Sequence, residues 1–504
     1  MSNKASLWVA LVASVIVGTL AVIALPAQPA TPPPPPTAES PANGTAEVPT
    51  KRDATVTVDA DAEVGPLNNP AEYQNQSGPS QLLGPADERR IAQLAPTVVR
   101  GWFKPESYYD HVTETYNFNY ASSGGSSRFY TYADQLRRLS KRIFANFDQC
   151  DPELMTPDHP DECRTVLKNG IRHYKLRYPS LRYIELFNEP DKTWEPAVFE
   201  RPAMNVEDYY TWYKIGYSVV NEINAELDPA VRLHIGGPAA YTFESEFTEQ
   251  FLDLYRADPD PAKRLDFLSY HQYRNGAHPA AVATEKETAR RWLSERGLNP
   301  DTPTFVTEYG VFPGTNTGTT FEEDLLAHAA AMSTLGYYYL QGGTDMVMHW
   351  VWDHGENDRK SMLVDGADGQ VYPYYNVVAM QRKLKSRRLA AISDSLDDNG
   401  MGVNVVASRD RSGVAVLATN YQWIDGTSTY DVHLTINDLP HEYRNGNILV
   451  ERYLVDATTS NYAFDPALSD LQRVERYELP PQASLTTSFQ LDRNAVSLIV
   501  LTPF

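Results

Sequence analysis

The chain has 504 residues, of which 42% are hydrophobic and 22% charged, a composition typical of an ordered globular protein. Its 44 Lys and Arg residues against 65 Asp and Glu residues give a formal net charge of −21. This acidity argues against nucleic acid or an anionic lipid surface as the main partner, because phosphate binding needs clustered cations. The length favours two domains, each with a core of its own.

The first 25 residues predict an export signal rather than part of the fold. Residues 7–25, LWVALVASVIVGTLAVIAL, carry no charge. This run is long for the apolar part of a signal peptide and just long enough to span a bilayer, so a cleaved signal and a retained membrane anchor both stay open. A proline-rich linker is predicted over residues 26–53. The body is therefore expected outside the cytoplasm, as a periplasmic, surface-anchored or secreted protein.

The two cysteines fit an oxidising compartment. Cys150 and Cys163 flank the loop-like segment DPELMTPDHPDE, and a disulfide between them is expected. With no third cysteine and no cluster of histidines in the sequence, we predict neither a metal site nor a cofactor.

Short apolar strands and amphipathic helices alternate along residues 54–392. Seven strands are clear, and residues 62–69 (AEVGPLNN) are a weak eighth at the front. The clear strands are predicted at residues 97–103, 142–148, 182–190, 231–239, 265–273, 304–310 and 344–353. Strands separated by helices imply a parallel sheet with crossover helices. Eight such units predict a (β/α)8 TIM barrel, an α/β fold. An open, doubly wound sheet is the alternative, disfavoured because no glycine-rich phosphate motif follows the first strands.

The pattern changes after residue 392, where short strands follow one another without helices. Six strands are predicted within 402–410, 413–422, 430–438, 448–456, 484–492 and 495–503. Residues 393–504 therefore predict a C-terminal β-sandwich domain, to which a strand from residues 54–61 (ATVTVDAD) can contribute.

Polar and aromatic residues stand near the ends of the predicted barrel strands. In this fold the carboxyl ends of the strands, with the loops that follow, build the active site. The candidate site residues are Arg100, Trp102, Asn188, Glu189, His271, Tyr273, Glu308, Trp350 and Trp352.

Two glutamates are the candidate catalytic pair, Glu189 on the fourth strand and Glu308 on the seventh. Cleavage of a glycosidic bond requires one protonated and one ionised carboxyl group facing each other across a cleft. We predict that repulsion between the two carboxylates keeps one of them protonated near neutrality. Glu189 is assigned as acid and then base, Glu308 as nucleophile, and Asn188 as a hydrogen-bond donor to the neighbouring sugar hydroxyl.

On these motifs the chain resembles the clan A glycoside hydrolases, and most closely glycoside hydrolase family 39, over residues 55–504. The matching motifs are FNEP at Glu189, VTEYG at Glu308, IGGPA at residues 235–239, SYHQY at residues 269–273 and HWVWD at residues 349–353. The resemblance implies a retaining hydrolase of an exported or environmental polysaccharide, with His271 and Tyr273 beside substrate and nucleophile and Trp350 stacked on the sugar.

Two departures from the family pattern place xylose as the sugar in doubt. Trp102 stands where xylosidase-like members carry a histidine, and Phe187 replaces the usual tryptophan before Asn-Glu-Pro. A β-xylosidase therefore remains one alternative. A catalytically silent, carbohydrate-binding envelope protein is the other.

Overall fold

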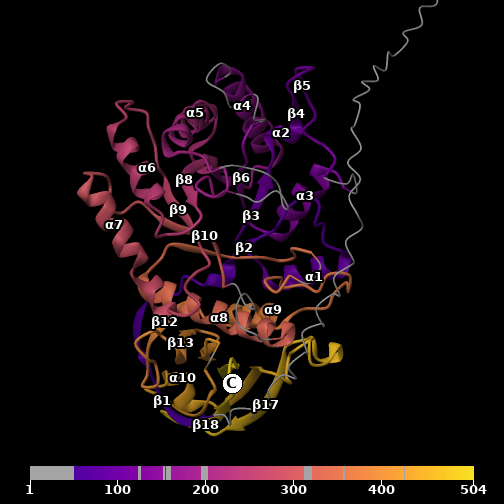
Figure 1. Cartoon of the computed structure of the whole chain (residues 1–504). Coiled ribbons are helices and arrows are strands. Elements are labelled where there is room, and N and C mark those ends of the chain that lie inside the picture. The colour runs from indigo at the N-terminus through magenta and orange to yellow at the C-terminus, as the bar shows by residue number, and fades with distance from the viewer. Residues whose placement is uncertain are drawn as a thin grey trace, which may run out of the picture. The chain divides into compact units, whose positions relative to one another are not determined.

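Eight parallel strands close into a barrel in the order β10-β11-β2-β3-β6-β7-β8-β9, which confirms the predicted TIM barrel (Figure 1). The computed structural model describes residues 50–122, 127–150, 154, 160–193, 203–311, 320–355, 358–424 and 426–504. The barrel strands are β2 (Tyr73–Asn75), β3 (Val98–Phe103), β6 (Arg142–Phe147), β7 (Leu181–Leu186), β8 (His234–Ala240), β9 (Phe267–Gln272), β10 (Thr304–Tyr309) and β11 (Met346–His349).

Helices connect the barrel strands and bury their apolar faces against them. The α-helices of this part are α1 (Pro85–Leu94), α2 (Pro105–Tyr108), α3 (Phe129–Leu139), α4 (Pro160–Arg177), α5 (Val206–Ala225), α6 (Glu246–Ala257), α7 (Glu285–Glu295), α8 (Phe321–Gly342) and α9 (Pro373–Arg382). Short 3-10 turns cover Pro70–Glu72, Pro229–Val231 and Pro279–Thr284, and β4 (Tyr109–Asp110) pairs with β5 (Thr115–Tyr116).

One cluster of apolar side chains fills the inside of the barrel, and another lies between the barrel strands and the surrounding helices. β9 and β10 are buried at every position, as expected for strands covered on both faces. A cluster that contains Phe144, Phe267, Phe305 and Met348 draws from strands around the barrel and fills its interior. The much larger cluster packs the outer face of the strands against the helices.

The predicted first barrel strand is wrong. Residues 62–66 belong to β1 (Thr50–Pro66), which lies in the second sheet, and the barrel position is taken by β2. β2 has only three residues, so it offers too few positions for an alternating or continuous apolar pattern to appear.

A nine-stranded mixed sheet forms the second part, in the order β17-β16-β19-β14-β13-β12-β1-β15-β18. Its two halves share one apolar cluster, with Val416 and Ile499 from one half and Val56 and Val432 from the other, as in a sandwich. Its further strands are β12 (Arg387–Ser393), β13 (Gly402–Asp410), β14 (Gly413–Tyr421), β15 (Ser428–Asn437), β16 (Ile448–Val455), β17 (Gln472–Leu479), β18 (Leu485–Leu491) and β19 (Val496–Pro503). The short helix α10 (His441–Asn445) and a 3-10 turn at Pro466–Leu468 connect some of them.

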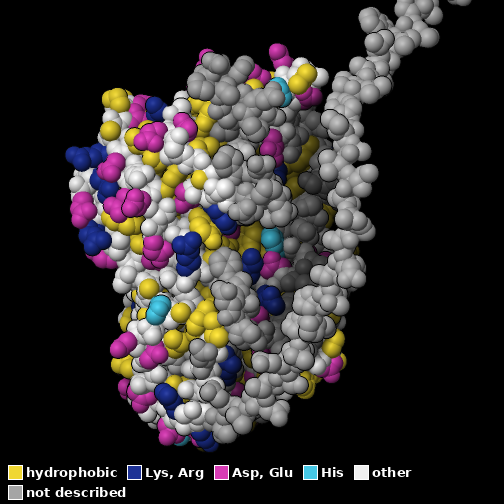
Figure 2. All heavy atoms as spheres, viewed as in Figure 1, with side chains coloured by type: hydrophobic (Ala, Val, Ile, Leu, Met, Phe, Trp, Pro, Cys, Tyr) yellow, Lys and Arg dark blue, Asp and Glu magenta, His cyan; other side chains and the backbone are white. Residues whose placement is uncertain are grey.

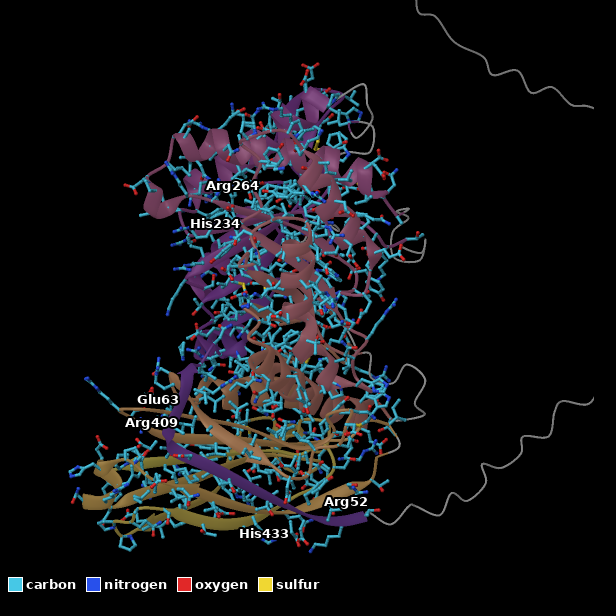
Figure 3. All side chains as sticks on the ribbon, turned by 90° about the vertical axis from the view of Figure 1, so that its left-hand side faces the viewer. Arg52, Glu63, His234, Arg264, Arg409 and His433 are labelled. Atoms are coloured by element: carbon cyan, nitrogen blue, oxygen red, sulfur yellow. A yellow bond between two sulfur atoms is a disulfide. The ribbon has the colours of Figure 1, made fainter. Side chains whose placement is uncertain are left out.

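Segment 54–61 lies in this sheet, within β1, between β12 and β15. Glu63 near its end accepts hydrogen bonds from Arg387 of β12 at 2.9 Å and from Arg409 of β13 at 3.1 Å, and Figure 3 labels Glu63 and Arg409 close to each other. The sequence reading missed β12 and β17. β12 follows a barrel helix directly, and β17 (QRVERYEL) is rich in charged residues because it is an edge strand.

Barrel and sheet belong to one compact unit, Val48–Phe504. Helix α8 contacts β13 and β14, and Ser333 and Thr419 share a hydrogen bond of 2.7 Å. The Tyr421 hydroxyl donates to the carbonyl of Gly276 at 2.7 Å, which ties the sheet to the loop after β9.

The predicted export or anchor segment, residues 1–25, lies outside the described residues, as does the predicted linker up to residue 49; the last four linker residues already belong to β1. None of the helices in the described ranges has the length and apolar character that a bilayer-spanning helix needs.

Candidate active site

The FNEP turn follows β7 and presents Glu189 at the carboxyl end of the barrel. Phe187 and Glu189 adopt φ angles of 62° and 47°, in the left-handed region that non-glycine residues rarely occupy. The turn is held by its neighbours: Phe187 N donates to the carbonyl of Phe147 at 2.8 Å, and Glu189 N donates to that of Ala239 at 3.1 Å. Strained backbone that adjacent strands fix in this way is typical of functional sites.

Glu308 lies in β10, 4% exposed, and both of its carboxylate oxygens are held. Arg100 Nη1 donates to Oε1 at 2.7 Å, and the Tyr273 hydroxyl donates to Oε2 at 2.7 Å. His271 Nδ1 lies 3.6 Å from Oε2. The carboxylate is thereby fixed in one orientation.

Glu189 is 3% exposed and lies on the other side of His271. His271 Nδ1 is 2.9 Å from Glu189 Oε1, and Lys192 Nζ is 3.3 Å from Oε2. One oxygen of Glu189, one oxygen of Glu308 and a ring nitrogen of His271 all lie within 4.8 Å of one another. The structure therefore brings together both predicted catalytic carboxyl groups.

Arg100 is fully buried and organises this centre from beneath. Its guanidinium contacts Glu185 Oε2 at 2.7 Å and donates to Asn188 Oδ1 at 2.9 Å, in addition to Glu308. The prediction that Arg100 binds substrate is corrected: its side chain is 0% exposed and contacts protein groups instead. Glu185, in β7, is equally buried and also accepts from Thr307 at 3.0 Å.

Charges in the centre shift three pKa values. Burial alone would lower the pKa of His271, but Glu308 and Glu189 raise it. Burial alone would raise the pKa of Glu189, but the hydrogen bond and charge of His271, with Lys192, lower it. Burial, with the charge of Glu308, raises the pKa of Tyr273 well above its usual value.

These two directions favour the protonated form of His271 and the ionised form of Glu189 in the free protein. They differ from the prediction that carboxylate repulsion keeps Glu189 protonated. The physical reason is that a histidine lies between the two glutamates, so the charges of both carboxylates favour its protonated form.

Glu189, His271 and Glu308 have the residue types and spacing of a three-ligand metal site. The chemistry around them fits a metal ion poorly. Arg100 and Tyr273 already donate to the oxygens of Glu308, and Lys192 places a further positive charge beside Glu189. A divalent cation here would face two protein cations in a buried setting.

Aromatic side chains line one side of the centre. Trp350, which follows β11, and Val351 pack with Tyr273 and with the half-buried Trp102. The indole Nε1 of Trp102 is buried and has no hydrogen-bond partner among the described residues. Arg100 lies 5.2 Å from the centroid of the Trp102 ring.

Trp352 does not belong to the site, and its predicted substrate contact is corrected. Its side chain is 0% exposed, packs in the large cluster behind the barrel and donates from Nε1 to Gln74. The predicted eighth strand extended through Trp352, but β11 already ends at His349.

Cys150 and Cys163 form a disulfide, which links the end of β6 to helix α4. Lys192 and Glu185 are site residues that sequence reasoning missed. Glu185 interrupts the apolar run YIELF, and this buried-strand position was the signal that could have found it.

No protein-family model matches this sequence, and no curated protein matches it. Solved structures do match its fold. A glucosidase from Croceicoccus marinus shares 18% identity at a TM-score of 0.66, over 90% of this chain and 100% of that one. The GH39 enzyme from Xanthomonas axonopodis pv. citri shares 15% identity at a TM-score of 0.65, over 90% and 98%.

A monomeric beta-xylosidase from Caulobacter crescentus shares 15% identity at a TM-score of 0.66, over 89% of this chain and 99% of that one. At such identities the likeness establishes the fold: a TIM barrel joined to a β-sandwich, as in these glycosidases. The fold class and the resemblance drawn from the sequence motifs therefore agree with the structure.

Proposed function

We propose that the protein is a retaining glycoside hydrolase. The observation that carries this proposal is the pair of buried carboxylates, whose nearest oxygens lie within 4.8 Å across His271. Retaining enzymes hold their two carboxyl groups about 5–5.5 Å apart, whereas inverting enzymes leave about 6.5–9.5 Å for a water molecule. The fold shared with known glycosidases supports the same conclusion.

The first step needs a proton on Glu189. The 2.9 Å hydrogen bond to His271 allows the proton to move from Nδ1 to Glu189 Oε1, which leaves both groups neutral. A bound sugar that excludes water favours this neutral pair, because the burial of Glu189 opposes its ionised form.

Glu308 then attacks the anomeric carbon while Glu189 gives its proton to the departing glycosidic oxygen. The carbon–oxygen bond to the leaving sugar breaks as the bond to Glu308 forms. Arg100 and Tyr273 hold the attacking carboxylate in place, and both of their hydrogen bonds to it weaken as its charge disappears. Glu189, now ionised, takes a proton from water, and the hydroxyl oxygen displaces Glu308 with net retention.

Asn188 and Trp350 are assigned to the sugar bound at the reacting carbon. Arg100 donates to the amide oxygen of Asn188, and this contact directs the amide nitrogen away from Arg100 as a donor for a sugar hydroxyl. Trp350 packs against Tyr273, beside the nucleophile, and offers a ring for stacking.

The test is hydrolysis of aryl β-glycosides and polysaccharides by single variants. Glu308→Gln should reduce turnover to background. Glu189→Gln should lower kcat by about 10²–10⁴-fold for poor leaving groups, and by far less for dinitrophenyl glycosides, which need no protonation. Glu246→Gln, an exposed glutamate on α6, is the control. Full activity in Glu308→Gln would refute the proposal, and binding of oligosaccharides by wild type without cleavage would favour a silent binding protein.

The sugar and the linkage are separate questions. Turnover of an aryl β-xyloside above other aryl glycosides would assign the protein as a β-xylosidase. Proton NMR of the first product formed reports its anomeric configuration, and inversion would contradict the double displacement.

We also propose that the body is exported. The disulfide between Cys150 and Cys163 and the uncharged run at residues 7–25 support this location. Fractionation of cells with a tagged chain, with mass spectrometry of its N-terminus, distinguishes a cleaved signal from an anchor. Recovery of the intact chain from the cytoplasm would refute export.

A further inference from the structure

Two cations share one aromatic ring beside the proposed acid. Lys192 Nζ lies 4.0 Å from the ring centroid of Tyr241, and the guanidinium carbon of Arg274 lies 5.1 Å from the same centroid. They come from different loops, after β7 and after β9, so the barrel brings them together. The chain as a whole is acidic, yet Lys and Arg side chains gather near the middle of the face in Figure 2.

Hydrogen bonds hold the backbone of Tyr241, the residue whose ring the two cations contact. Tyr241 follows β8 directly, and its backbone N–H donates to Asp191 Oδ1 at 2.8 Å. The other oxygen of Asp191 accepts from the Ser245 hydroxyl at 2.6 Å. Asp191 is therefore held by the turn that carries Tyr241.

Arg274 has no carboxylate partner among the described residues. Its side chain is exposed, and the contact that holds it is the Tyr241 ring. The distances of 4.0 and 5.1 Å from Lys192 and Arg274 to the same ring centroid limit how far apart the two like charges can lie, and these charges repel each other. An anion bound between them would relieve this repulsion, and a guanidinium matches a carboxylate with two parallel hydrogen bonds.

The position of the pair identifies the part of the substrate that it meets. Lys192 contacts Glu189, which gives its proton to the leaving oxygen, whereas Glu308 is held by Arg100 and Tyr273. The sugar that departs lies beyond that oxygen, on the Glu189 side.

We propose that Arg274 and Lys192 form a subsite for an anionic sugar on the leaving-group side, with the carboxylate of a uronic acid as its ligand. The substrate class is then an acidic polysaccharide in which the unit released at the reducing side of the cut is a uronate. This inference rests on the proposed function for the direction of cleavage. The binding of the carboxylate itself can be measured without turnover.

The experiment measures binding to the Glu308→Gln protein by calorimetry. The probes are oligosaccharides of mannuronan, hyaluronan and glucuronoxylan, each paired with a carboxyl-reduced form in which the carboxylate is replaced by a hydroxymethyl group. We expect at least one native probe to bind about tenfold or more tightly than its reduced form, a preference that weakens between 0.05 and 0.5 M salt.

Arg274→Gln should remove that preference without weakening the reduced form. Arg411→Gln, which removes an exposed arginine from the turn between β13 and β14, is the matched control and should keep the preference. The last probe is an oligosaccharide of neutral sugars that carries sulfate groups. If it binds as tightly as the native uronate probe, the assignment of the ligand as a carboxylate is overturned. No preference for any of the three native probes, or a preference that survives Arg274→Gln, would overturn the subsite.

Failure of the proposed function has a different signature. If the wild-type protein and Glu308→Gln show the same turnover while Arg274→Gln abolishes the carboxylate preference, the subsite is supported and the proposed hydrolysis is refuted. If Glu308→Gln abolishes turnover and no native probe binds more tightly than its carboxyl-reduced form, the proposed hydrolysis is supported and the subsite is refuted.

Discussion

Replacement of Arg100 by methionine tests how the barrel interior holds its charges. Methionine occupies part of the same volume but cannot donate a hydrogen bond. The substitution leaves Glu185, which is 0% exposed, and Glu308, which is 6% exposed at its side chain, without the cation that lies 2.7 Å from each.

The expected loss of stability is large. Removal of one partner from a buried ion pair typically lowers the free energy of unfolding by about 3–5 kcal/mol, because the remaining charge is buried and uncompensated. Arg100 serves two carboxylates and Asn188, so we expect a loss at the upper end of this range. Removal of the second charge in Arg100→Met/Glu185→Leu should recover part of the loss.

Urea-induced unfolding, followed by fluorescence and circular dichroism, measures this difference. Arg290→Met is the control, because Arg290 forms an exposed pair with Asp301 at 3.3 Å and should contribute less than about 1 kcal/mol. A loss below about 1 kcal/mol in Arg100→Met, or a double variant less stable than the single one, would refute the reasoning.

Three further perturbations have defined outcomes. A β-carbon on Gly276 would lie 2.4 Å from the Trp423 ring, so Gly276→Ala should destabilise the loop after β9 by about 1–3 kcal/mol and lower kcat/KM. The additional substitution Trp423→Leu should restore part of the stability and part of kcat/KM. Equal kcat/KM in Gly276→Ala and in wild type would contradict this prediction. The Cys150–Cys163 disulfide closes a loop of sequence separation 13, and its reduction should lower the free energy of unfolding by about 3 kcal/mol. Denaturant titrations measure this loss, and an unchanged midpoint of unfolding would exclude it. Burial raises the pKa of the Glu285 carboxyl group to about 8, so the folded state holds a proton that the unfolded state releases near pH 4.5. The free energy of unfolding should therefore be highest below pH 4.5 and fall as the pH rises to 8. Unfolding curves of Glu285→Gln should lack this pH dependence.

The barrel was predictable because its signal is local. β7, β9 and β10 are short segments in which at least half of the residues are aliphatic or aromatic, and the helices between the strands keep a clear helical period. β2 was not predictable, since three residues carry no pattern and their assignment as a strand depends on pairing with β3 and β11. β12 was missed for a similar reason: its membership of the second sheet depends on β1, more than 300 residues away in sequence.

The candidate carboxylates were also predictable, because Glu189 and Glu308 end or follow strands whose order fixes one common rim. Their partners were harder. Nothing in the order of residues indicates that Arg100 turns under the rim to join Glu185, or that Lys192 and Arg274 meet over Tyr241.

The sequence by itself determined the closed parallel barrel, the all-β second part and the pair of glutamates, because hydrophobic periodicity and the order of the strands can be seen in the sequence. Only the tertiary structure decided which side chains face inward and which charges meet. Trp350 and Trp352 differ by two positions, yet one lies beside Tyr273 and the other is sealed behind the barrel. The fold also places His271 Nδ1 2.9 Å from Glu189 and 3.6 Å from Glu308, a contact that no sequence separation encodes.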